Sequence, residues 1–258
     1  MRRYLGLVLV LVLAVGCNAL YDLEPTTLRD PNNPFDAADY DLDGHGNSVD
    51  NCPAIANADQ TDGDDDDVGD VCDLHPGVGT DRIVERTFFA DPAFDRDRWH
   101  VSNFAFEARA VVSDVAATGA MLRSKRSYED RFVAVELGFE MIVWNPHPFY
   151  GGINIILDDV GGPQAELRHE SDALMVLSAG PTNEPSDSTN GYIEPAVGVD
   201  IPIKLTLAYD RDSTRLVARL GAVESGLDVP STLPPGPMAI SLVESAARIR
   251  YLVIYGRR

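Results

Sequence analysis

The residues best suited to chemistry in this sequence are aspartates gathered near its amino terminus. Residues 36–73 hold 13 acidic residues and no Lys or Arg, in a chain of 258 residues with a net charge of −20. The first group has alternating aspartates, a glycine, and a carboxylate at the twelfth position: Asp39, Asp41, Asp43, Gly44 and Asp50. Calcium binds six to eight oxygen atoms, and alternating carboxylates in a loop that turns at a glycine can all face one ion. This spacing predicts a calcium site rather than a solvated acidic linker.

A second group with the same alternation follows at Asp62, Asp64 and Asp66, with Asp73 at the twelfth position of its loop. Its sixth position is Asp67, where the first group has a glycine. Because Asp tolerates left-handed backbone less well than Gly, we expect the second site to be strained or weaker. The segment holds little apolar surface, so we expect calcium to act structurally and to order it as a rigid spacer.

The continuous pattern from Asp39 to Asp73 resembles the thrombospondin type 3 repeat. Besides the aspartate groups, the resemblance rests on Asp50-Asn51-Cys52-Pro53, Asn57, Gln60 and Gly69-Asp70-Val71-Cys72-Asp73, while Asn47 departs from an expected Asp. It implies calcium as the cofactor, a Cys52–Cys72 disulfide, and three sets of ligands: Asp39, Asp41, Asp43 and Asp50 in the first site, Asp62, Asp64, Asp66 and Asp73 in the second, and Asp70 in a shared site. An EF-hand or dockerin loop is the alternative, but an EF-hand needs Glu at position 12 and flanking helices.

The amino terminus is typical of an exported protein. Met1-Arg2-Arg3 is positively charged, and Leu5–Val15 is an uncharged apolar run too short to span a bilayer. Ala14-Val15-Gly16-Cys17 resembles the lipobox of bacterial lipoproteins, although that family prefers Leu in place of Ala14. The resemblance implies that residues 1–16 are a signal peptide and that Cys17 carries a lipid that anchors the protein to a membrane. An ordinary signal peptide that happens to contain a cysteine is the alternative.

These features predict four parts and a location. Residues 1–16 are removed, residues 17–38 form a flexible tether rich in Pro and Asn, residues 39–75 form the calcium repeat, and residues 80–258 form a second domain. We expect the protein in the outer membrane or on the cell surface of a Gram-negative-type bacterium. The acidic balance excludes nucleic acid as a partner, because nucleic-acid binding needs a basic footprint.

The second domain reads as an antiparallel β-sandwich. Short runs with a period of two, rich in β-branched and aromatic residues, alternate with Gly, Pro, Asn and Asp. The predicted strands are Val84–Phe89, Phe104–Val112, Ala120–Arg123, Arg131–Val143, Gly152–Leu157, Ala173–Leu177, Ile203–Tyr209, Leu216–Leu220, Met238–Leu242 and Ile249–Tyr255. From Phe88-Phe89 to the terminal strand, the layout resembles the concanavalin A-like or laminin-G-like jelly roll. The fold class is therefore mainly β, a jelly-roll sandwich preceded by an irregular Asp-rich repeat.

Such sandwiches often bind glycans on aromatic side chains, so Trp99, Trp144 and Tyr150 are candidate ligand residues for a glycan or a surface protein. The competing interpretation places both tryptophans in the core. A glycosidase needs paired carboxylates, but Glu136 and Glu140 stand too far apart along one strand for a retaining pair. No other catalytic motif occurs, so we expect no enzyme. The functions left open are an adhesion-like recognition module, a structural envelope protein, and a hydrolase with an unrecognised site.

Overall fold

The computed structural model of the protein describes residues 39–89, 98–107, 110–113, 119–144, 152–157, 163–171, 174–181, 189–193, 198–229 and 235–257. The expected signal peptide, the tether, the lipid anchor at Cys17 and the candidate ligand residue Tyr150 lie outside these residues. The described part of the chain contains fifteen strands and no helix, which confirms the mainly β fold class. No helix with the length and apolarity needed to cross a membrane is found there.

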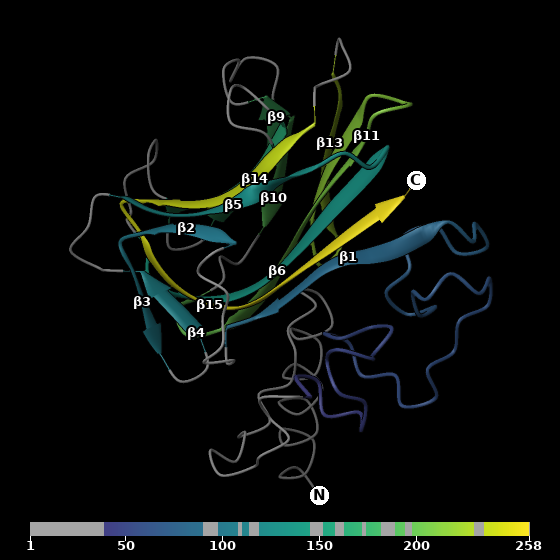
Figure 1. Ribbon diagram of the computed structural model, residues 1–258. Helices are drawn as coiled ribbons and strands as arrows, with labels where there is room; N and C mark the ends of the chain where they lie inside the picture. The colour runs from purple at the N-terminus through teal and green to yellow at the C-terminus, as the bar shows by residue number, and fades with distance from the viewer. Residues whose placement is uncertain are drawn as a thin grey trace, which may run out of the picture.

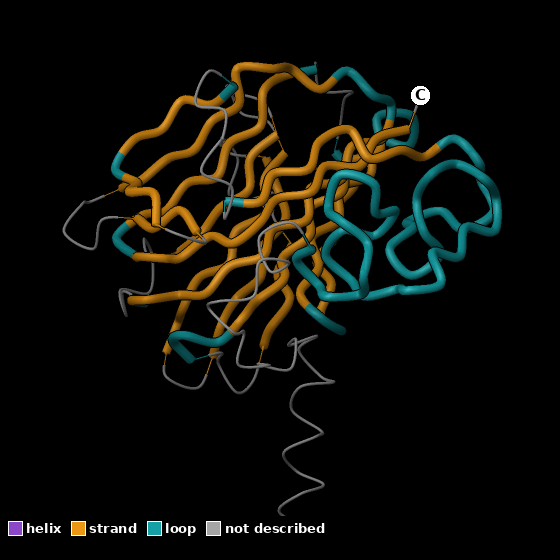
Figure 2. Tube along the Cα trace, turned by 60° about the horizontal axis from the view of Figure 1, so that its bottom comes forward, coloured by secondary structure: helices purple, strands orange, loops and turns teal. Residues whose placement is uncertain are grey.

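Two antiparallel sheets pack face to face (Figures 1 and 2). In the larger sheet, β15 (Ala246–Arg257) pairs along its length with β6 (Phe132–Val143). On its other side it pairs first with β4 (Ala110–Ser113) and then with β1 (Asp81–Phe88). The sheet runs in the order β13-β12-β11-β6-β15-β4-β3, and its other strands are β3 (Phe104–Glu107), β11 (Pro202–Asp210), β12 (Arg215–Leu220) and β13 (Val223–Asp228).

The smaller sheet has seven strands in the order β10-β9-β8-β7-β14-β5-β2. Their bounds are β2 (Trp99–Ser102), β5 (Gly119–Tyr128), β7 (Gly152–Leu157), β8 (Pro163–Ser171), β9 (Leu174–Pro181), β10 (Thr189–Ile193) and β14 (Gly236–Val243). Strands distant in sequence thus lie side by side, because β14 joins β5 and β7.

The core between the sheets follows from the period of two in each strand. On β6, Val135 and Leu137 are fully buried and belong to the main core cluster. On β11, Leu207 pairs with Val135 and Leu205 pairs with Leu137, and both are fully buried. Since alternate residues point to opposite faces, Ala134 and its neighbours of the same parity on β6 project from the outer face of the larger sheet.

Most predicted strands are confirmed, with shifted ends. The run Phe104–Val112 was expected as one strand but forms two, β3 and β4, which pair with each other. Strands β2, β8, β10 and β13 were not predicted from the sequence. Three of these lie at sheet edges, and all four are short or carry several polar residues, so their strand structure depends on main-chain pairing with neighbours more than on an apolar pattern.

The Asp-rich repeat packs against the outer face of the larger sheet, beside β1, β15 and β6 (Figure 1). Its buried Cys52, Ala54, Val68 and Cys72 join one apolar cluster with residues of the sheet: Phe88, Phe132, Ala134, Tyr251, Val253 and Tyr255. The expectation of a rigid spacer is therefore wrong. The repeat is poor in apolar residues, but the sheet supplies the missing apolar surface, and docking removes both surfaces from water.

Candidate functional site

The first aspartate group is folded into a tight loop by its own carboxylates. The amides of Leu42 and Gly44 donate to the two carboxylate oxygens of Asp39, at 2.8 and 3.0 Å. The amide of His45 donates to Oδ1 of Asp43 at 2.8 Å. These local bonds explain why short aspartates are needed here, because their side chains reach the backbone two to five residues away.

The second group repeats this arrangement 23 positions later in the chain (39 to 62). The amides of Asp65 and Asp67 donate to the two oxygens of Asp62, both at 2.9 Å. The amide of Val68 donates to Oδ1 of Asp66 at 3.0 Å. Each of these bonds is the counterpart of one in the first loop, so the two aspartate groups form two copies of one local structure.

The second loop makes the same turn as the first, although Asp67 stands in the place of the glycine. Gly44 has φ of 100° and Asp67 has φ of 72°, so both lie in the left-handed region. The fourth position of each loop is also left-handed, at Leu42 with φ of 65° and Asp65 with φ of 60°. Asp is among the non-glycine residues that adopt this conformation most readily. The Asp67 departure therefore carries a backbone cost and does not abolish the turn.

The residues at the ninth position brace the loops. Oδ1 of Asn47 accepts a hydrogen bond from the amide of Tyr40, and Oδ1 of Asp70 accepts one from the amide of Gly63, both at 2.8 Å. Asp70 was expected in a shared site. The structure makes it the counterpart of Asn47 and places it outside the two groups of three mutually close aspartates.

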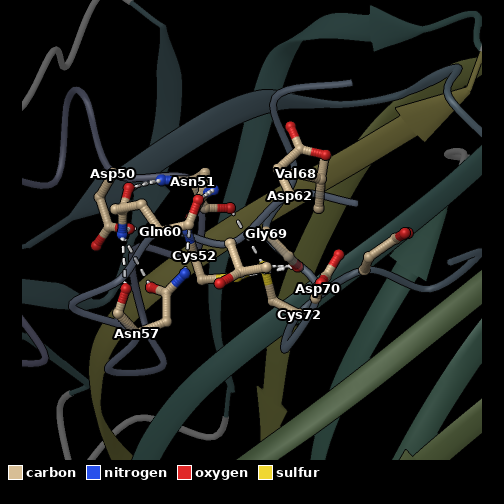
Figure 3. The surroundings of a disulfide bond; sticks show 12 residues. Asp50, Asn51, Cys52, Asn57, Gln60, Asp62, Val68, Gly69, Asp70 and Cys72 are labelled. Atoms are coloured by element: carbon tan, nitrogen blue, oxygen red, sulfur yellow. Dashed lines mark hydrogen bonds between the residues drawn. A yellow bond between two sulfur atoms is a disulfide. The ribbon is translucent and has the colours of Figure 1, made fainter. Parts of the chain in front are cut away.

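The closing carboxylates Asp50 and Asp73 occupy equivalent places. Oδ1 of Asp50 accepts from the amide of Cys52, and Oδ1 of Asp73 accepts from the amide of His75, both at 2.8 Å. Gln60 also donates to Oδ1 of Asp50 at 2.9 Å (Figure 3). In both cases one oxygen is used locally, which fixes the side chain and leaves the other oxygen available.

The two loops meet the chemical requirements of a hard cation. In each group of three, Asp39, Asp41 and Asp43 or Asp62, Asp64 and Asp66, one oxygen per residue lies within 4.8 Å of the others. Oδ2 of Asp41 and its counterpart, Oδ2 of Asp64, are buried without a hydrogen-bond partner. So are Oδ2 of Asp50 and Oδ1 of Asp81. Buried carboxylate oxygens without partners are costly. A calcium ion would satisfy them, since it takes carboxylate oxygens at 2.3–2.6 Å.

The electrostatics of the clusters agree with this. Burial, reinforced by the charges of Asp50 and Asp43, raises the pKa of Asp41 to about 7. Burial also raises the pKa of Asp66 and of Asp73, and neighbouring carboxylates add to both shifts. A carboxylate crowded by like charges resists ionisation unless a cation balances them. The residues present therefore fit calcium in both loops.

The Cys52–Cys72 disulfide is confirmed, with a Cα–Cα distance of 5.7 Å. It links the residue two after Asp50 to the residue before Asp73, so it ties together the closing ends of the two loops (Figure 3). Gly69 lies in this crowded region. A Cβ atom there would lie within 3 Å of side-chain atoms of Asn51, Cys52 and Asn57, which explains the glycine.

The candidate ligand residues of the sandwich have different surroundings. Trp99 is only 4% exposed and belongs to the main core, so it offers little of its surface as a platform. Trp144 is half-buried and packs against the same core. Most of the surface of both tryptophans is thus packed in or against the core, as the competing interpretation expected. Trp99 also lines a cavity.

That cavity, of about 220 Å³, lies where β1 passes the ends of β2 and β5. Its lining combines two aromatic residues with charged and polar groups: Glu85, Arg98, Trp99, Ser124, Lys125, Arg126 and Tyr128. Glu85 is buried and forms an ion pair with Arg98 at 2.8 Å. The guanidinium of Arg126 lies 5.5 Å from the ring centre of Tyr128. Burial, followed by the charge of Glu85, raises the pKa of Tyr128, so its hydroxyl stays a donor. The sequence pointed only to Trp99 among these residues, because the members of the set come from three separated segments.

Glu136 and Glu140 both lie on the outer face of the larger sheet, and both are held by neighbours. Glu136 is buried and accepts a hydrogen bond from the hydroxyl of Tyr251 at 3.0 Å. Glu140 accepts from Arg248 at 3.1 Å and from Arg250 at 3.0 and 3.1 Å. Two guanidinium groups on one carboxylate act as structural clamps.

A second cavity, of about 180 Å³, lies between the repeat and the larger sheet. The repeat contributes Ile55, Val71, Cys72, Asp73 and Leu74, and the sandwich contributes Glu136, Lys204, Thr206, Arg219 and Gly221. It exists because the repeat docks on the sheet.

Known proteins are similar to both parts of the chain, the repeat in sequence and the sandwich in fold. The thrombospondin type 3 repeat family matches residues 37–60, which include the first aspartate loop and the segment up to Gln60. Among curated proteins, none matches the sequence of this chain significantly.

Solved structures are similar to the sandwich in fold. The metal-free carbohydrate recognition domain of Emp46p has a TM-score of 0.52 at 15% identity and covers 64% of this chain and 90% of that one. The exoplasmic/lumenal domain of VIP36, in a form bound to Ca²⁺ and Man3GlcNAc, has a TM-score of 0.51 at 10% identity, covering 69% and 91%. A conserved carbohydrate esterase of the Shiga toxin-encoding bacteriophage phi24B has 0.53 at 6% identity, covering 69% and 100%. These identities show a shared lectin-like sandwich fold and nothing finer.

Proposed function

We propose that this chain is an exported, lipid-anchored recognition protein whose sandwich binds a glycan and whose repeat binds calcium structurally. The observation that carries the glycan part is the cavity lined by Glu85, Arg98, Trp99, Ser124, Lys125, Arg126 and Tyr128. Small-ligand sites combine apolar walls with a few converging polar groups, and this cavity has that composition. Two of the similar structures described above are carbohydrate-recognising domains, which supports the same class of ligand.

The charge of the cavity favours an acidic sugar. Three cationic side chains line it against one carboxylate, in a chain whose net charge is −20. Arg98 pairs with Glu85, while Arg126 is exposed at the cavity and lies over the ring of Tyr128. The ring can cover the apolar face of a sugar, and the guanidinium can pair bidentately with a carboxylate or sulfate group. The cavity has room for about one sugar unit at the end or edge of a chain.

The calcium part rests on the buried carboxylate oxygens that lack partners in both loops. The residues that would hold the ions are Asp39, Asp41, Asp43 and Asp50 in the first loop and Asp62, Asp64, Asp66 and Asp73 in the second. Calcium there supplies charge neutralisation and cross-linking, which orders the repeat. The repeat then stays docked on the sheet, and the lipid on Cys17 holds the whole at a membrane.

The glycan proposal is tested with the mature protein, loaded with calcium, on an array of neutral, carboxylated and sulfated glycans. We expect binding to acidic glycans, lost on Arg126→Gln and retained on Arg131→Gln. Arg131 is a matched control, because it is an exposed arginine paired with Asp212 at 3.7 Å and does not line the cavity. Binding that survives Arg126→Gln would move the ligand to another surface. No binding by the folded, calcium-loaded protein would favour a structural envelope role.

A further inference from the structure

The two calcium loops are capped from outside by different partners. In the first loop, the amide of Asn57, within the repeat, donates to Oδ2 of Asp43 at 3.0 Å. In the second loop, the counterpart of Asp43 is Asp66, and its Oδ2 accepts from the amide of Asp81 at 2.8 Å. Asp81 is the first residue of strand β1. The sandwich thus takes, in the second loop, the place that an internal segment takes in the first.

The side chain of Asp81 is buried at this cap. It is 5% exposed, and its Oδ2 lies 2.7 Å from Nδ1 of His75. Its Oδ1 is buried without a hydrogen-bond partner, as is Oδ2 of Asp64. A carboxylate with one anchored oxygen and one buried, unpartnered oxygen is already oriented toward a ligand, as Asp50 is in the first loop.

The segment that leads into β1 also approaches the second loop closely at Gly79. A Cβ atom at Gly79 would lie 2.6 Å from the carbonyl oxygen of Asp64, so only glycine permits this approach. His75 links Asp81 to the closing carboxylate of the second loop, because its ring nitrogen lies 2.7 Å from Oδ2 of Asp81 and its amide donates to Oδ1 of Asp73 at 2.8 Å. Two negative charges held by one residue would repel each other without a cation.

We propose that Asp81 is a further calcium ligand of the second loop, so that one ion joins the repeat to strand β1 of the sandwich. The inference rests on the proposed calcium binding and extends the ligand set beyond the repeat. The second loop then has five carboxylates, Asp62, Asp64, Asp66, Asp73 and Asp81, against four in the first. Since calcium affinity rises with ligand charge, the second site becomes the tighter one, in spite of Asp67. Calcium would thereby lock the docked arrangement.

The test compares Asp81→Asn with Asp65→Asn in the full mature chain. Asp65 is a matched control because it lies in the same loop, is exposed, has its side chain outside the group of close carboxylates, and is at a left-handed position that Asn tolerates. Calcium binding is measured by titration calorimetry. Luminescence lifetimes of bound terbium in H₂O and D₂O count the water molecules on each ion. Melting temperatures are recorded with calcium and with chelator.

We expect Asp81→Asn to weaken one of the two sites by at least about ten-fold, the loss that even outer partners of a metal cause. It should add water to the terbium ion in that site and shrink the calcium-induced rise in melting temperature. In chelator the variant should melt no lower than the wild type, because relief of the repulsion between Asp81 and the neighbouring carboxylates offsets the loss of the bond to His75.

Asp65→Asn should leave all three readouts unchanged. Unchanged calcium affinity and unchanged hydration of the bound ion in Asp81→Asn would overturn the proposal. An equal fall in melting temperature with and without calcium would also overturn it, because Asp81 would then be a purely structural partner of His75. If the wild type binds no calcium at all, both this inference and the calcium part of the proposed function fail. If the wild type binds two ions and Asp81→Asn changes neither, only this inference fails.

Discussion

The ring of Tyr40, in the first aspartate loop, lies 4.8 Å from the ring of Tyr251 on β15, in an edge-on arrangement. Phe88 on β1 completes the contact, at 5.3 Å from Tyr40 and 5.9 Å from Tyr251. A residue that stands between Asp39 and Asp41 in the sequence therefore packs directly on the sheet. The conformation of the aspartate loop and the docking of the repeat are thus coupled through one side chain.

Replacing Tyr40 should loosen the repeat. Tyr40→Ala removes a half-buried aromatic ring, and we expect a loss of about 2 kcal/mol in the free energy of unfolding, below the 3–5 kcal/mol of a fully buried aromatic residue. The repeat should also become more sensitive to limited proteolysis than the sandwich. Tyr40→Phe, which keeps the ring, is the control and should resist the protease as the wild type does. Equal resistance of Tyr40→Ala would show that the ring contact does not hold the repeat.

Calcium binding should separate into two steps, one for each loop. Asp41→Asn and Asp64→Asn remove counterpart carboxylates, so each should weaken one ion and spare the other in titration calorimetry. Calcium at about 100 times Kd should stabilise the wild type by about 2.7 kcal/mol per site, and each variant should lose the share of one site. Asp59→Asn, an exposed aspartate outside both groups, is the control. Loss of both ions in either single variant would mean that the loops form one cooperative site.

We expect Gly138 to be required for close packing on the outer face of the larger sheet, where the repeat docks. It lies on β6, and a Cβ atom there would overlap the ring of Tyr251 across the strand. We expect Gly138→Ala to cost about 1–3 kcal/mol by overpacking and to shift Tyr251 away from Tyr40. Gly119→Ala, on β5, is the control, since its Cβ atom would meet its nearest neighbour, the carbonyl oxygen of Leu242, at 3.4 Å. Chemical denaturation measures both, and equal stability of the two variants would contradict the overlap.

The fold should fail at alkaline pH. Burial raises the pKa of Tyr128, Tyr251 and Tyr255, with further contributions from Glu85 for the first and Glu136 for the other two. Phenols whose folded pKa lies above the unfolded value of about 10 favour the folded state below that pH and lose this contribution as pH rises past it. Phenolate absorbance from these tyrosines should therefore appear only together with unfolding seen by circular dichroism. Titration of all nine tyrosines in the folded protein would contradict this.

The lipid anchor is tested at Cys17. In cells fed a labelled fatty acid, the wild type should carry the label and sediment with membranes. Cys17→Ser should carry no label and appear in a soluble fraction, because Cys17 is the proposed attachment point. A double replacement of Cys52 and Cys72 controls for cysteine loss as such and should keep the label. Release of the wild type without label would point to an ordinary signal peptide.

Local sequence patterns were enough to predict the aspartate loops and most strands, because the interactions that form them join residues close in sequence. The loop-forming bonds of Asp39 and Asp62 reach no further than five residues, so spacing alone located both loops. The alternation of inward-facing and outward-facing residues on β6 and β11 is likewise visible within each strand's own sequence. Edge strands such as β10 and β13 gave no comparable signal, because their conformation depends on the neighbour with which they pair.

Residue type and spacing were sufficient to predict the two aspartate loops that fit a calcium ion, the β class of the sandwich and the pairing of the two cysteines. The docking of the repeat on the outer face through Tyr40, Phe88 and Tyr251, and the cap that Asp81 forms on the second loop, depend on the tertiary structure. It also assembled the cavity around Glu85 from three separate segments. The physical reason is that these contacts join residues far apart in the chain, and their positions follow from the sheet order and the packing of the two sheets.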